Sequence, residues 1–219
     1  SADVAFVCVP TEMRSDGSCD TSIVEDTVAW LDAGLIIIRS TVVPGTTERL
    51  AAQYPRKRIV FQPEYIGETV AHPMNNESER TFLIFGGSAE NTSRAIEVFQ
   101  TKYNASVKIL CCTAREAELM KYMANSSIGV MVTFMNEFYS ICKAFGANYH
   151  SVREGFLMDP RMSRYFSFVY PEGRGFGGKC IPKDSNAIVH AARAVGYNPQ
   201  FIADTLANNE RVRSLSVPK

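Results

Sequence analysis

Short apolar runs alternate with longer amphipathic segments in the first half of the chain. Each run is almost continuous in Val, Ile, Leu and Phe, which is typical of a strand covered on both faces. The segments between them place apolar residues at helical spacing and begin near Asp, Ser or Thr caps. Strands that alternate with helices predict an α/β fold with a doubly wound parallel sheet. The runs span residues 4–10, 35–40, 59–62, 81–87 and 107–110, and the predicted helices end near 33, 54 and 103.

The pattern changes near Thr113 and stays helical to the end of the chain. From Ala114 to Phe145 there is no proline, and Gly129 is the one weak helix breaker. Apolar residues recur there at helical spacing, so the stretch predicts one helix of about 30 residues. Shorter helices are predicted at 149–158, 183–195 and 199–213. The predicted domains are therefore an α/β domain, 1–112, and an all-helical domain with a long central helix, 113–219.

Composition narrows the class of protein. Of the 219 residues, 46% are hydrophobic and 21% are charged, which is ordinary for a globular protein. The formal net charge is zero, so nothing indicates a nucleic-acid or anionic-membrane surface. No apolar run approaches the roughly 18 residues that a membrane span needs. We therefore expect no nucleic-acid partner and no membrane partner.

Cysteine and histidine usage bears on the compartment and on metals. Six cysteines stand at 8, 19, 111, 112, 142 and 180 without a CxxC pair, and a chain of this size needs no disulfide framework. A reducing, cytoplasmic compartment is therefore predicted. His72, His150 and His190 are far apart and lack the spacing of ligands, so no metal site is expected.

The most distinctive stretch is the glycine-rich segment 173–184, with four glycines, one cysteine and a Lys-Asp pair. Glycines let the backbone approach a ligand closely, because no Cβ intervenes. Pro182 suits the first turn of a helix, which would put Cys180 beside the helix N-terminus, where a thiolate is favoured. If that helix begins at Cys180, Asp184 follows at i+4 on the same face. A nucleophile and a carboxylate would then meet in a glycine-walled cleft; a loop with a buried structural cysteine is the alternative.

Polar residues follow three of the predicted strands. Thr11 follows the first, Ser40 and Thr41 the second, and Glu64 the third. In open α/β sheets, ligands bind at the carboxyl ends of the strands, so these side chains predict a site. Taken singly, Ser and Thr at such places can also be simple helix caps.

Lys121 and Asn125 stand four residues apart on the long predicted helix. This spacing puts both on one face, beside apolar neighbours that favour partial burial. A solvated lysine is the alternative interpretation.

Six stretches, in order along the whole chain, resemble the UDP-glucose/GDP-mannose dehydrogenase family, most closely its UDP-glucose-oxidising branch. Each alone is a weak signal, but six in register make a specific match. The first domain then resembles the carboxy-terminal part of an NAD-binding, Rossmann-like domain, and the second a central dimerisation domain that carries the catalytic cysteine. The stretches are FVCVPT (6–11), STV (40–42), QPEYIGE (62–68), ELMKYMAN (118–125), DPRM (159–162) and GFGGKCIPKD (175–184).

The resemblance implies NAD as the cofactor and a nucleotide sugar, UDP-glucose, as the substrate. Enzymes of the family oxidise the C6 alcohol of the sugar to a carboxylate with two molecules of NAD. Cys180 matches the nucleophile that captures the aldehyde as a thiohemiacetal, which a second hydride transfer converts to a thioester. Lys121 would stabilise the developing oxyanion, with Asn125 holding it or a water.

The remaining matched residues divide among acid–base, binding and dimer roles. Asp184 would act in the acid–base steps with a water that Thr41 orders, and Glu64 would serve in thioester hydrolysis. Arg161 matches an arginine that reaches the sugar in the partner subunit's site, which implies a homodimer through the helical domain. The matched cofactor contacts are Thr11, Ser40, Glu68 and Lys183, and the matched substrate contacts also include Tyr165, Phe166, Gly175, Phe176 and Gly177.

Two departures from the family pattern bear on activity. The family begins with a strand–GxGxxG–helix unit, and residues 173–178 are no substitute because no predicted strand precedes them. The family also has a further carboxy-terminal domain. We therefore expect a chain truncated at both ends that alone turns over UDP-glucose very slowly or not at all. The alternatives are a GDP-mannose or UDP-N-acetylhexosamine dehydrogenase, and a non-catalytic remnant that binds nucleotide sugars and dimerises.

Overall fold

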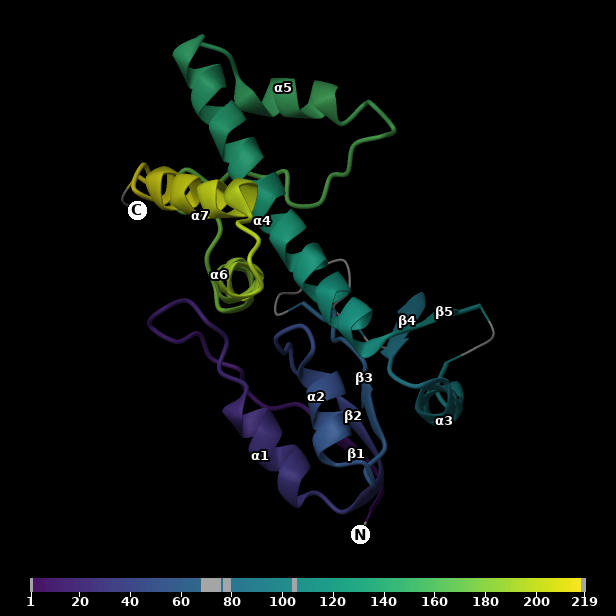
Figure 1. Cartoon of the computed structure of the whole chain (residues 1–219). Coiled ribbons are helices and arrows are strands. Elements are labelled where there is room, and N and C mark those ends of the chain that lie inside the picture. The colour runs from purple at the N-terminus through teal and green to yellow at the C-terminus, as the bar shows by residue number, and fades with distance from the viewer. Residues whose placement is uncertain (1, 68–75, 77–79, 104–105, 218–219) are drawn as a thin grey trace. The chain divides into compact units, whose positions relative to one another are not determined.

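A computed structural model of the chain describes residues 2–67, 76, 80–103 and 106–217. The chain divides into two compact units, residues 1–122 and 123–219. The described part of the first unit holds a sheet with helices, and that of the second holds helices and loops (Figure 1). The boundary between the two units falls between Tyr122 and Met123, inside a helix, whereas the predicted domain boundary lies between 112 and 113. The division into domains stays a prediction.

Five strands form one sheet in the first unit: β1 (Ala2–Val7), β2 (Ala33–Ile38), β3 (Ile59–Phe61), β4 (Phe82–Gly86) and β5 (Lys108–Cys112). They lie in sequential order, and the predicted α/β class is confirmed. The first three strands are parallel, but β3 and β4 pair antiparallel at Phe61 and Gly86. The expectation of an all-parallel sheet is wrong at this pairing. An apolar run indicates that both faces of a strand are buried, but it does not indicate whether the strand runs parallel or antiparallel to its neighbour.

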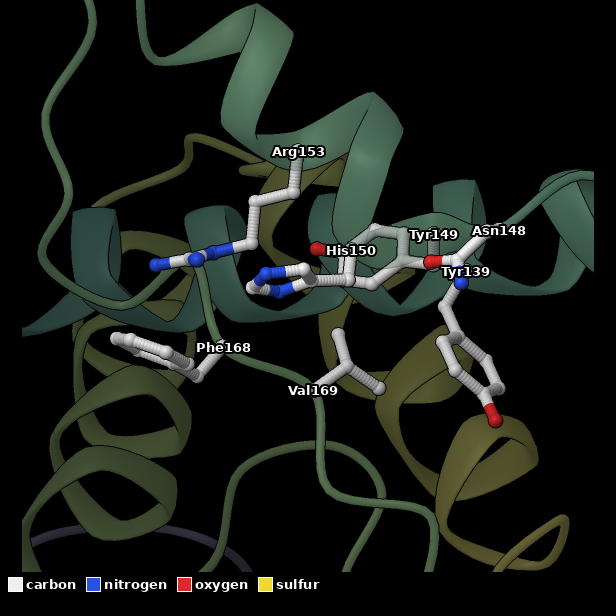
Figure 2. A pocket seen from close by; sticks show the side chains of 7 residues that line it. All are labelled: Tyr139, Asn148, Tyr149, His150, Arg153, Phe168 and Val169. Carbon is white, nitrogen blue, oxygen red and sulfur yellow. The ribbon is translucent and has the colours of Figure 1, made fainter.

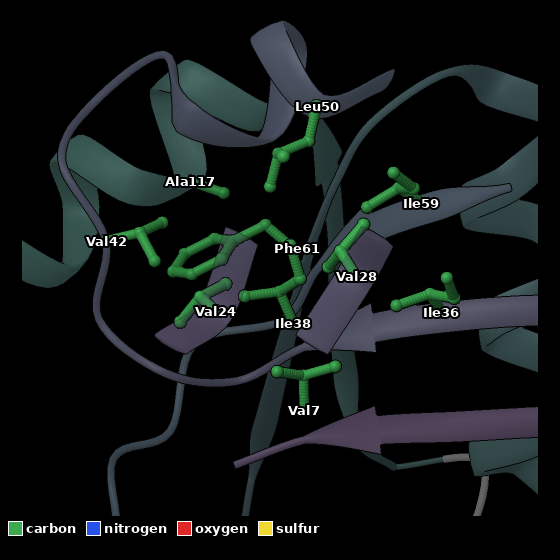
Figure 3. Close-up of a cluster of buried hydrophobic side chains, with 10 residues drawn as sticks. All are labelled: Val7, Val24, Val28, Ile36, Ile38, Val42, Leu50, Ile59, Phe61 and Ala117. Carbon is green, nitrogen blue, oxygen red and sulfur yellow. The ribbon is translucent and has the colours of Figure 1, made fainter. Parts of the chain in front are cut away.

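Two helices, α1 (Ser22–Trp30) and α2 (Thr46–Gln53), cover one face of the sheet. Successive side chains of a strand point to opposite faces, so Ile36 and Ile38 of β2 enter the same cluster. Figure 3 shows these side chains meeting between the strands and the helices. The other buried members of the cluster are Val7, Val24, Val28, Val42, Leu50, Ile59, Phe61 and Ala117.

A third helix, α3 (Ala89–Gln100), covers the opposite face. Leu35 and Ile37, each offset by one residue from the first cluster, pack there with Ala95 and Phe99 of the helix. The central strand β2 is thus buried on both sides, as its continuous apolar run predicts. The remaining buried members of this second cluster are Val60, Leu83 and Phe85.

The two outer strands differ from the expectation for a covered strand. Only Val7 of β1 is fully buried, and Phe6 remains 47% exposed. In β5, Ile109 and Leu110 are 42% and 45% exposed. Both strands lie at the ends of the sheet order, so each has a single neighbouring strand among the described residues. Exposed apolar surface is therefore present on both outer strands.

The predicted long helix is α4 (Ala114–Ala144), 31 residues in length. It begins with a reciprocal cap, in which the Glu116 carboxylate accepts a hydrogen bond from the Thr113 backbone N–H at 2.8 Å. Three further helices follow: α5 (Tyr149–Phe156), α6 (Cys180–Ala194) and α7 (Gln200–Arg213). None of the helices in the described ranges is long and apolar enough to cross a membrane.

Candidate functional site

The start of α6 places the predicted nucleophile. The helix begins at Cys180, three residues earlier than its apolar pattern predicts, so Pro182 lies in its first turn. The first N–H groups of a helix lack intrahelical acceptors, and Cys180, as the first residue of α6, lies at this end. The Cys180 side chain is exposed, whereas Asp184, one turn later on the same face, is 1% exposed. The expected i and i+4 relation is therefore present.

Three of the predicted site residues meet around the Asp184 carboxylate. The Asn125 amide Nδ2 of α4 donates a hydrogen bond to Asp184 Oδ2 at 2.5 Å, and Asn125 is itself 7% exposed. The other carboxylate oxygen, Oδ1, lies 2.6 Å from the ammonium of Lys183. Lys183, which the family resemblance matches to a cofactor contact, thus pairs with Asp184, the acid–base candidate. The buried Asp184 carboxylate is therefore held in place by the Lys183 ammonium on one oxygen and the Asn125 amide on the other.

The glycines of the 173–178 loop divide into two kinds. A Cβ at Gly175 would stand 2.5 Å from Asn209 Oδ1, and one at Gly177 would stand 2.5 Å from Arg213 Nη1. The side of the backbone where these two lack a side chain is therefore covered by α7, and a ligand does not reach it there. A Cβ at Gly173 or Gly178 would meet nothing within 4 Å. Gly175 and Gly177 therefore do not line a cleft on that side, and a glycine-walled cleft at Gly173 and Gly178 stays a prediction.

Phe176, a predicted substrate contact, is buried at 4% exposure. Its ring lies against α4 at Gly129, where an added Cβ would come within 3.3 Å of the ring. The weak breaker inside the long helix thus makes room for an aromatic side chain. The Phe176 backbone is also engaged, since its N–H donates to Asn209 Oδ1 at 2.7 Å and its C=O accepts from Asn209 Nδ2 at 2.9 Å.

The other predicted sugar contacts lie on the loop before the glycines. Tyr165 is 54% exposed, and Phe166 has φ 63°, the only positive φ outside glycine in the described residues. Such a conformation costs an aromatic residue free energy and is concentrated at functional positions. Arg161 extends into solvent with its side chain 80% exposed, paired with Asp159 at 2.5 Å. An exposed arginine on a loop is available to a partner molecule.

In the first unit, Ser40 links the carboxyl ends of two strands. Its hydroxyl accepts a hydrogen bond from the Val9 N–H at 2.8 Å and lies 2.7 Å from the Val9 carbonyl oxygen. The segment that follows β1 is thereby tied to the end of β2. Thr11 follows on that segment at 7% exposure, and Thr41 is half-buried next to Ser40. The polar residues that follow β1 and β2 are thus held next to each other at the same edge of the sheet.

Glu64, which follows β3, is tied by both charge and backbone. Its Oε1 accepts hydrogen bonds from the N–H groups of Tyr65 and Ile66, each at 2.7 Å. The carboxylate also forms ion pairs with Arg39 and with Arg80, whose side chain is almost fully buried. Sequence reasoning missed both arginines, although Arg39 ends a buried apolar run and such a cation implies an anionic partner. Glu68 lies outside the described residues.

Lys121 of α4 is placed by an aromatic ring. Its Nζ lies 4.9 Å from the centroid of the Tyr65 ring, within cation–π range. Burial raises the pKa of the Tyr65 hydroxyl to about 12, so the ring stays neutral at physiological pH. Lys121 is therefore half-buried against the face of the Tyr65 ring, and it is not a fully solvated lysine.

Glu118, one turn before Lys121, is a completely buried carboxyl group that the sequence analysis did not single out. It accepts hydrogen bonds from the N–H groups of Gly45 and Thr47, the latter at 2.9 Å, and so caps the N-terminus of α2 from α4. Burial raises its pKa, although those hydrogen bonds act in the opposite direction. The contact fixes α4 beside the segment that follows Thr41.

The second unit also contains a pocket of about 260 Å³ (Figure 2). Arg153 enters it from α5, 3% exposed, with its guanidinium carbon 3.7 Å from the centre of the Phe168 ring. None of the predicted catalytic residues lines it. The lining residues are Tyr139, Asn148, Tyr149, His150, Arg153, Phe168 and Val169. Within the described ranges there is no cluster of His, Cys, Asp or Glu that could hold a metal ion.

The described residues fit part of a dinucleotide. The side-chain oxygen of Gln62, 1% exposed at the end of β3, accepts no hydrogen bond from any residue that the structure describes, and hydroxyls stand at the ends of β1 and β2. Such donors and acceptors at strand ends suit a ribose or an amide. The only GxGxxG spelling, at 173–178, follows no strand and precedes Cys180 in the second unit, so it does not form a pyrophosphate loop.

Two family models match the chain. The UDP-glucose/GDP-mannose dehydrogenase family, NAD binding domain, matches residues 1–104, and the central domain of the same family matches residues 115–211. The UDP-glucose 6-dehydrogenase of Pseudomonas aeruginosa is 32% identical over 233 residues, covering 98% of this chain and 50% of that protein. The chain spans about half the length of the curated relatives it matches. NAD is the cofactor that these matches indicate.

Solved structures give the same result. A UDP-glucose dehydrogenase from Pyrobaculum islandicum aligns with a TM-score of 0.83 at 27% identity, over 95% of this chain and 50% of that chain. A UDP-D-ManNAc dehydrogenase from Pyrococcus horikoshii aligns with a TM-score of 0.80 at 25% identity, over 96% and 50%. The likeness therefore extends over both units of the chain.

Proposed function

The chain belongs to the UDP-glucose/GDP-mannose dehydrogenase family, and from this premise we propose that it carries the catalytic cysteine of an NAD-dependent UDP-glucose 6-dehydrogenase. One observation carries the proposal. Exposed Cys180 begins α6, and buried Asp184 shares its face and is held by Asn125. A thiol at a helix N-terminus with a fixed carboxylate beside it suits covalent capture of an aldehyde.

The proposed reaction passes through a sulfur-bound intermediate. When bound, NAD would supply the hydride acceptor for each of the two oxidations at C6. After the first, the Cys180 thiolate adds to the C6 aldehyde, a C–S bond forms, and the former carbonyl oxygen takes a proton. Loss of that proton and of the second hydride leaves a thioester. Water then attacks C6, the C–S bond breaks, and the carboxylate product leaves a free thiol.

The other residues have supporting roles in this proposal. Lys121 and Asn125, one turn apart on α4, donate to the oxygen on C6 while it carries negative charge. Asp184 exchanges protons through a water that Thr41 orders, and Glu64 serves in thioester hydrolysis. The proposed cofactor contacts are Thr11, Ser40, Glu68 and Lys183. The proposed substrate contacts are Arg161, Tyr165, Phe166 and the backbone of Gly175 and Gly177, whereas the backbone N–H and C=O of Phe176 are already bonded to α7.

A panel of nucleotide sugars tests the substrate. We expect the full-length protein (the gene product in which this chain occurs) to form two NADH per UDP-glucose. We expect its kcat/KM for GDP-mannose and UDP-N-acetylmannosamine to be lower by at least about a hundredfold, because a site built for one sugar rejects misplaced polar groups. Equal or better turnover of another sugar would replace UDP-glucose as the substrate. Binding of UDP-glucose without NADH from any sugar would favour the non-catalytic remnant.

We also propose a homodimer through the helical unit. Large apolar side chains form an exposed stripe along α4, where Phe138 is 40% exposed. Phe145, the first residue after α4, is 84% exposed, and Val152 of α5 is also exposed. Exposed apolar patches of this kind mark interaction surfaces. The chain should therefore sediment as a dimer at micromolar concentration, and Phe138→Glu should shift it to monomers. A wild-type monomer at those concentrations would contradict this assembly.

A further inference from the structure

We propose that Arg174, Asn209 and Arg213 are positioning residues, which clamp the 173–178 loop between α4 and α7 and so fix the start of α6 where Cys180 lies. This inference deepens the proposed function, since it assigns a purpose to the loop that leads to the proposed nucleophile. The three side chains belong to the second unit, and all of their contacts used below lie within it. None of them touches the reacting atoms in this proposal.

The α4 side of the clamp is a buried arginine. Arg174 is 6% exposed, and its guanidinium donates to the Asn136 side-chain oxygen and to the Asn136 carbonyl, each at 2.7 Å. It also donates to the Ser140 hydroxyl at 2.9 Å and stacks 4.7 Å from the centre of the Tyr139 ring. These contacts come from one turn of α4, so they fix the guanidinium in position and orientation. A buried cation held this way resists displacement, because its donors would lose their acceptors.

On the α7 side of the clamp, the side-chain amide of Asn209 hydrogen-bonds the backbone of Phe176, as a neighbouring strand would. Asn209, 2% exposed, accepts from the Phe176 N–H and donates to the Phe176 C=O, at 2.7 Å and 2.9 Å. Arg213, one turn later, donates to the same carbonyl at 3.0 Å. Both backbone polar groups of Phe176, its N–H and its C=O, are therefore satisfied by α7. The Phe176 ring fixes the same residue from the other side, against Gly129 of α4.

The loop sequence fits this clamp. Gly175 has φ 74°, and an added Cβ would stand 2.5 Å from Asn209 Oδ1 and 2.9 Å from Arg213 Cγ. Gly173, two residues earlier, has open space in the same direction. Glycine at 175 is thus required by the approach of α7, whereas glycine at 173 has no such constraint. Anchors at 174 and 176 leave only three residues, 177–179, before Cys180, which limits how far its backbone can move.

The test separates the clamp from the reaction. In the 219-residue chain, Asn209→Leu removes both hydrogen bonds to Phe176, and Asn208→Leu changes the exposed neighbour on the same helix as a matched control. We expect amide hydrogen exchange in peptides covering 173–183 to accelerate by about tenfold or more for Asn209→Leu, and to stay at the wild-type rate for Asn208→Leu. Arg174→Lys, which keeps the charge but loses the forked donor, serves if Asn209→Leu fails to fold, and should accelerate exchange in the same peptides. Unchanged exchange in the folded variants would overturn the clamp.

The positioning role has its own readout in the full-length protein. There, Asn209→Leu should lower kcat for UDP-glucose by about a hundredfold while KM changes much less, because a nucleophile misplaced by about 1 Å loses rate and not binding. Asn209→Asp, which keeps the acceptor for the Phe176 N–H, should recover part of kcat. Faster exchange with an unchanged kcat would overturn the positioning role. If the wild-type protein oxidises no nucleotide sugar, the proposed function fails while the exchange experiment still decides the clamp.

Discussion

Serine in place of Cys180 is expected to lower complete oxidation of UDP-glucose by the full-length protein by at least about a thousandfold. A serine hydroxyl is a far weaker nucleophile toward an aldehyde near neutral pH than a thiolate, and Cys180 is exposed at the first position of α6 where attack is possible. NADH formation would be measured from UDP-glucose and from its C6 aldehyde. Mass spectrometry of the intact protein should show a sugar adduct only in the wild type.

The matched control for this substitution is Cys111→Ser. Cys111 is also an exposed thiol, but it lies in β5 of the first unit and has no proposed role. Its serine variant should oxidise UDP-glucose at close to the wild-type rate. If the Cys180→Ser protein carries UDP-glucose through both oxidations as fast as the wild type, covalent capture by Cys180 is wrong.

Removal of the Glu118 carboxylate by Glu118→Ala should destabilise the first unit by about 2–4 kcal/mol. The carboxylate is completely buried and caps the N-terminus of α2 through Gly45 and Thr47, so alanine leaves buried N–H groups without acceptors and a cavity beside them. Urea unfolding would be followed by circular dichroism and by Trp30, the single tryptophan, which ends α1 in the same unit.

Two further variants isolate the cause. Glu97→Ala removes an exposed carboxylate from α3 and should change stability by less than about 0.5 kcal/mol. Glu118→Gln keeps an acceptor oxygen and has no titration. Because burial raises the pKa of Glu118, the stability it contributes is fully present below its unfolded pKa and is lost as pH rises through the folded value. Wild-type stability relative to Glu118→Gln should therefore fall as the pH rises above the unfolded pKa of about 4. If the wild type instead becomes more stable relative to Glu118→Gln as the pH rises, burial does not raise the pKa of Glu118.

Much of the fold follows from hydrophobic patterning alone. The β2 run buries Leu35 and Ile37 on one face and Ile36 and Ile38 on the other, so its continuous apolar character predicts a central strand correctly. The same pattern cannot report that β4 runs opposite to β3, because direction depends on the path of the connection. It also cannot separate a central strand from an edge strand such as β1, whose coverage depends on neighbours.

The candidate site is predictable where spacing along one helix decides the geometry. Cys180 and Asp184 share a face because they are four residues apart in α6, and Lys121 and Asn125 are related in the same way on α4. Contacts between distant segments leave no such local signal. Asn209 follows 33 residues after Phe176, and in sequence it is one polar residue among several on a helix. Its amide is recognisable as a backbone partner only once the loop is packed against it.

The reciprocal amide contact of Asn209 also limits which length changes this protein can tolerate during evolution. Each residue of an α-helix turns by about 100°, so one residue inserted between Gln200 and Thr205 would rotate Asn209 away from Phe176. A same-size insertion at 195–199, before α7 begins, leaves the rotation of the helix adjustable, because loops absorb such changes. Homologous sequences should therefore vary in length at 195–199 and keep a constant count of residues from the start of α7 to this asparagine.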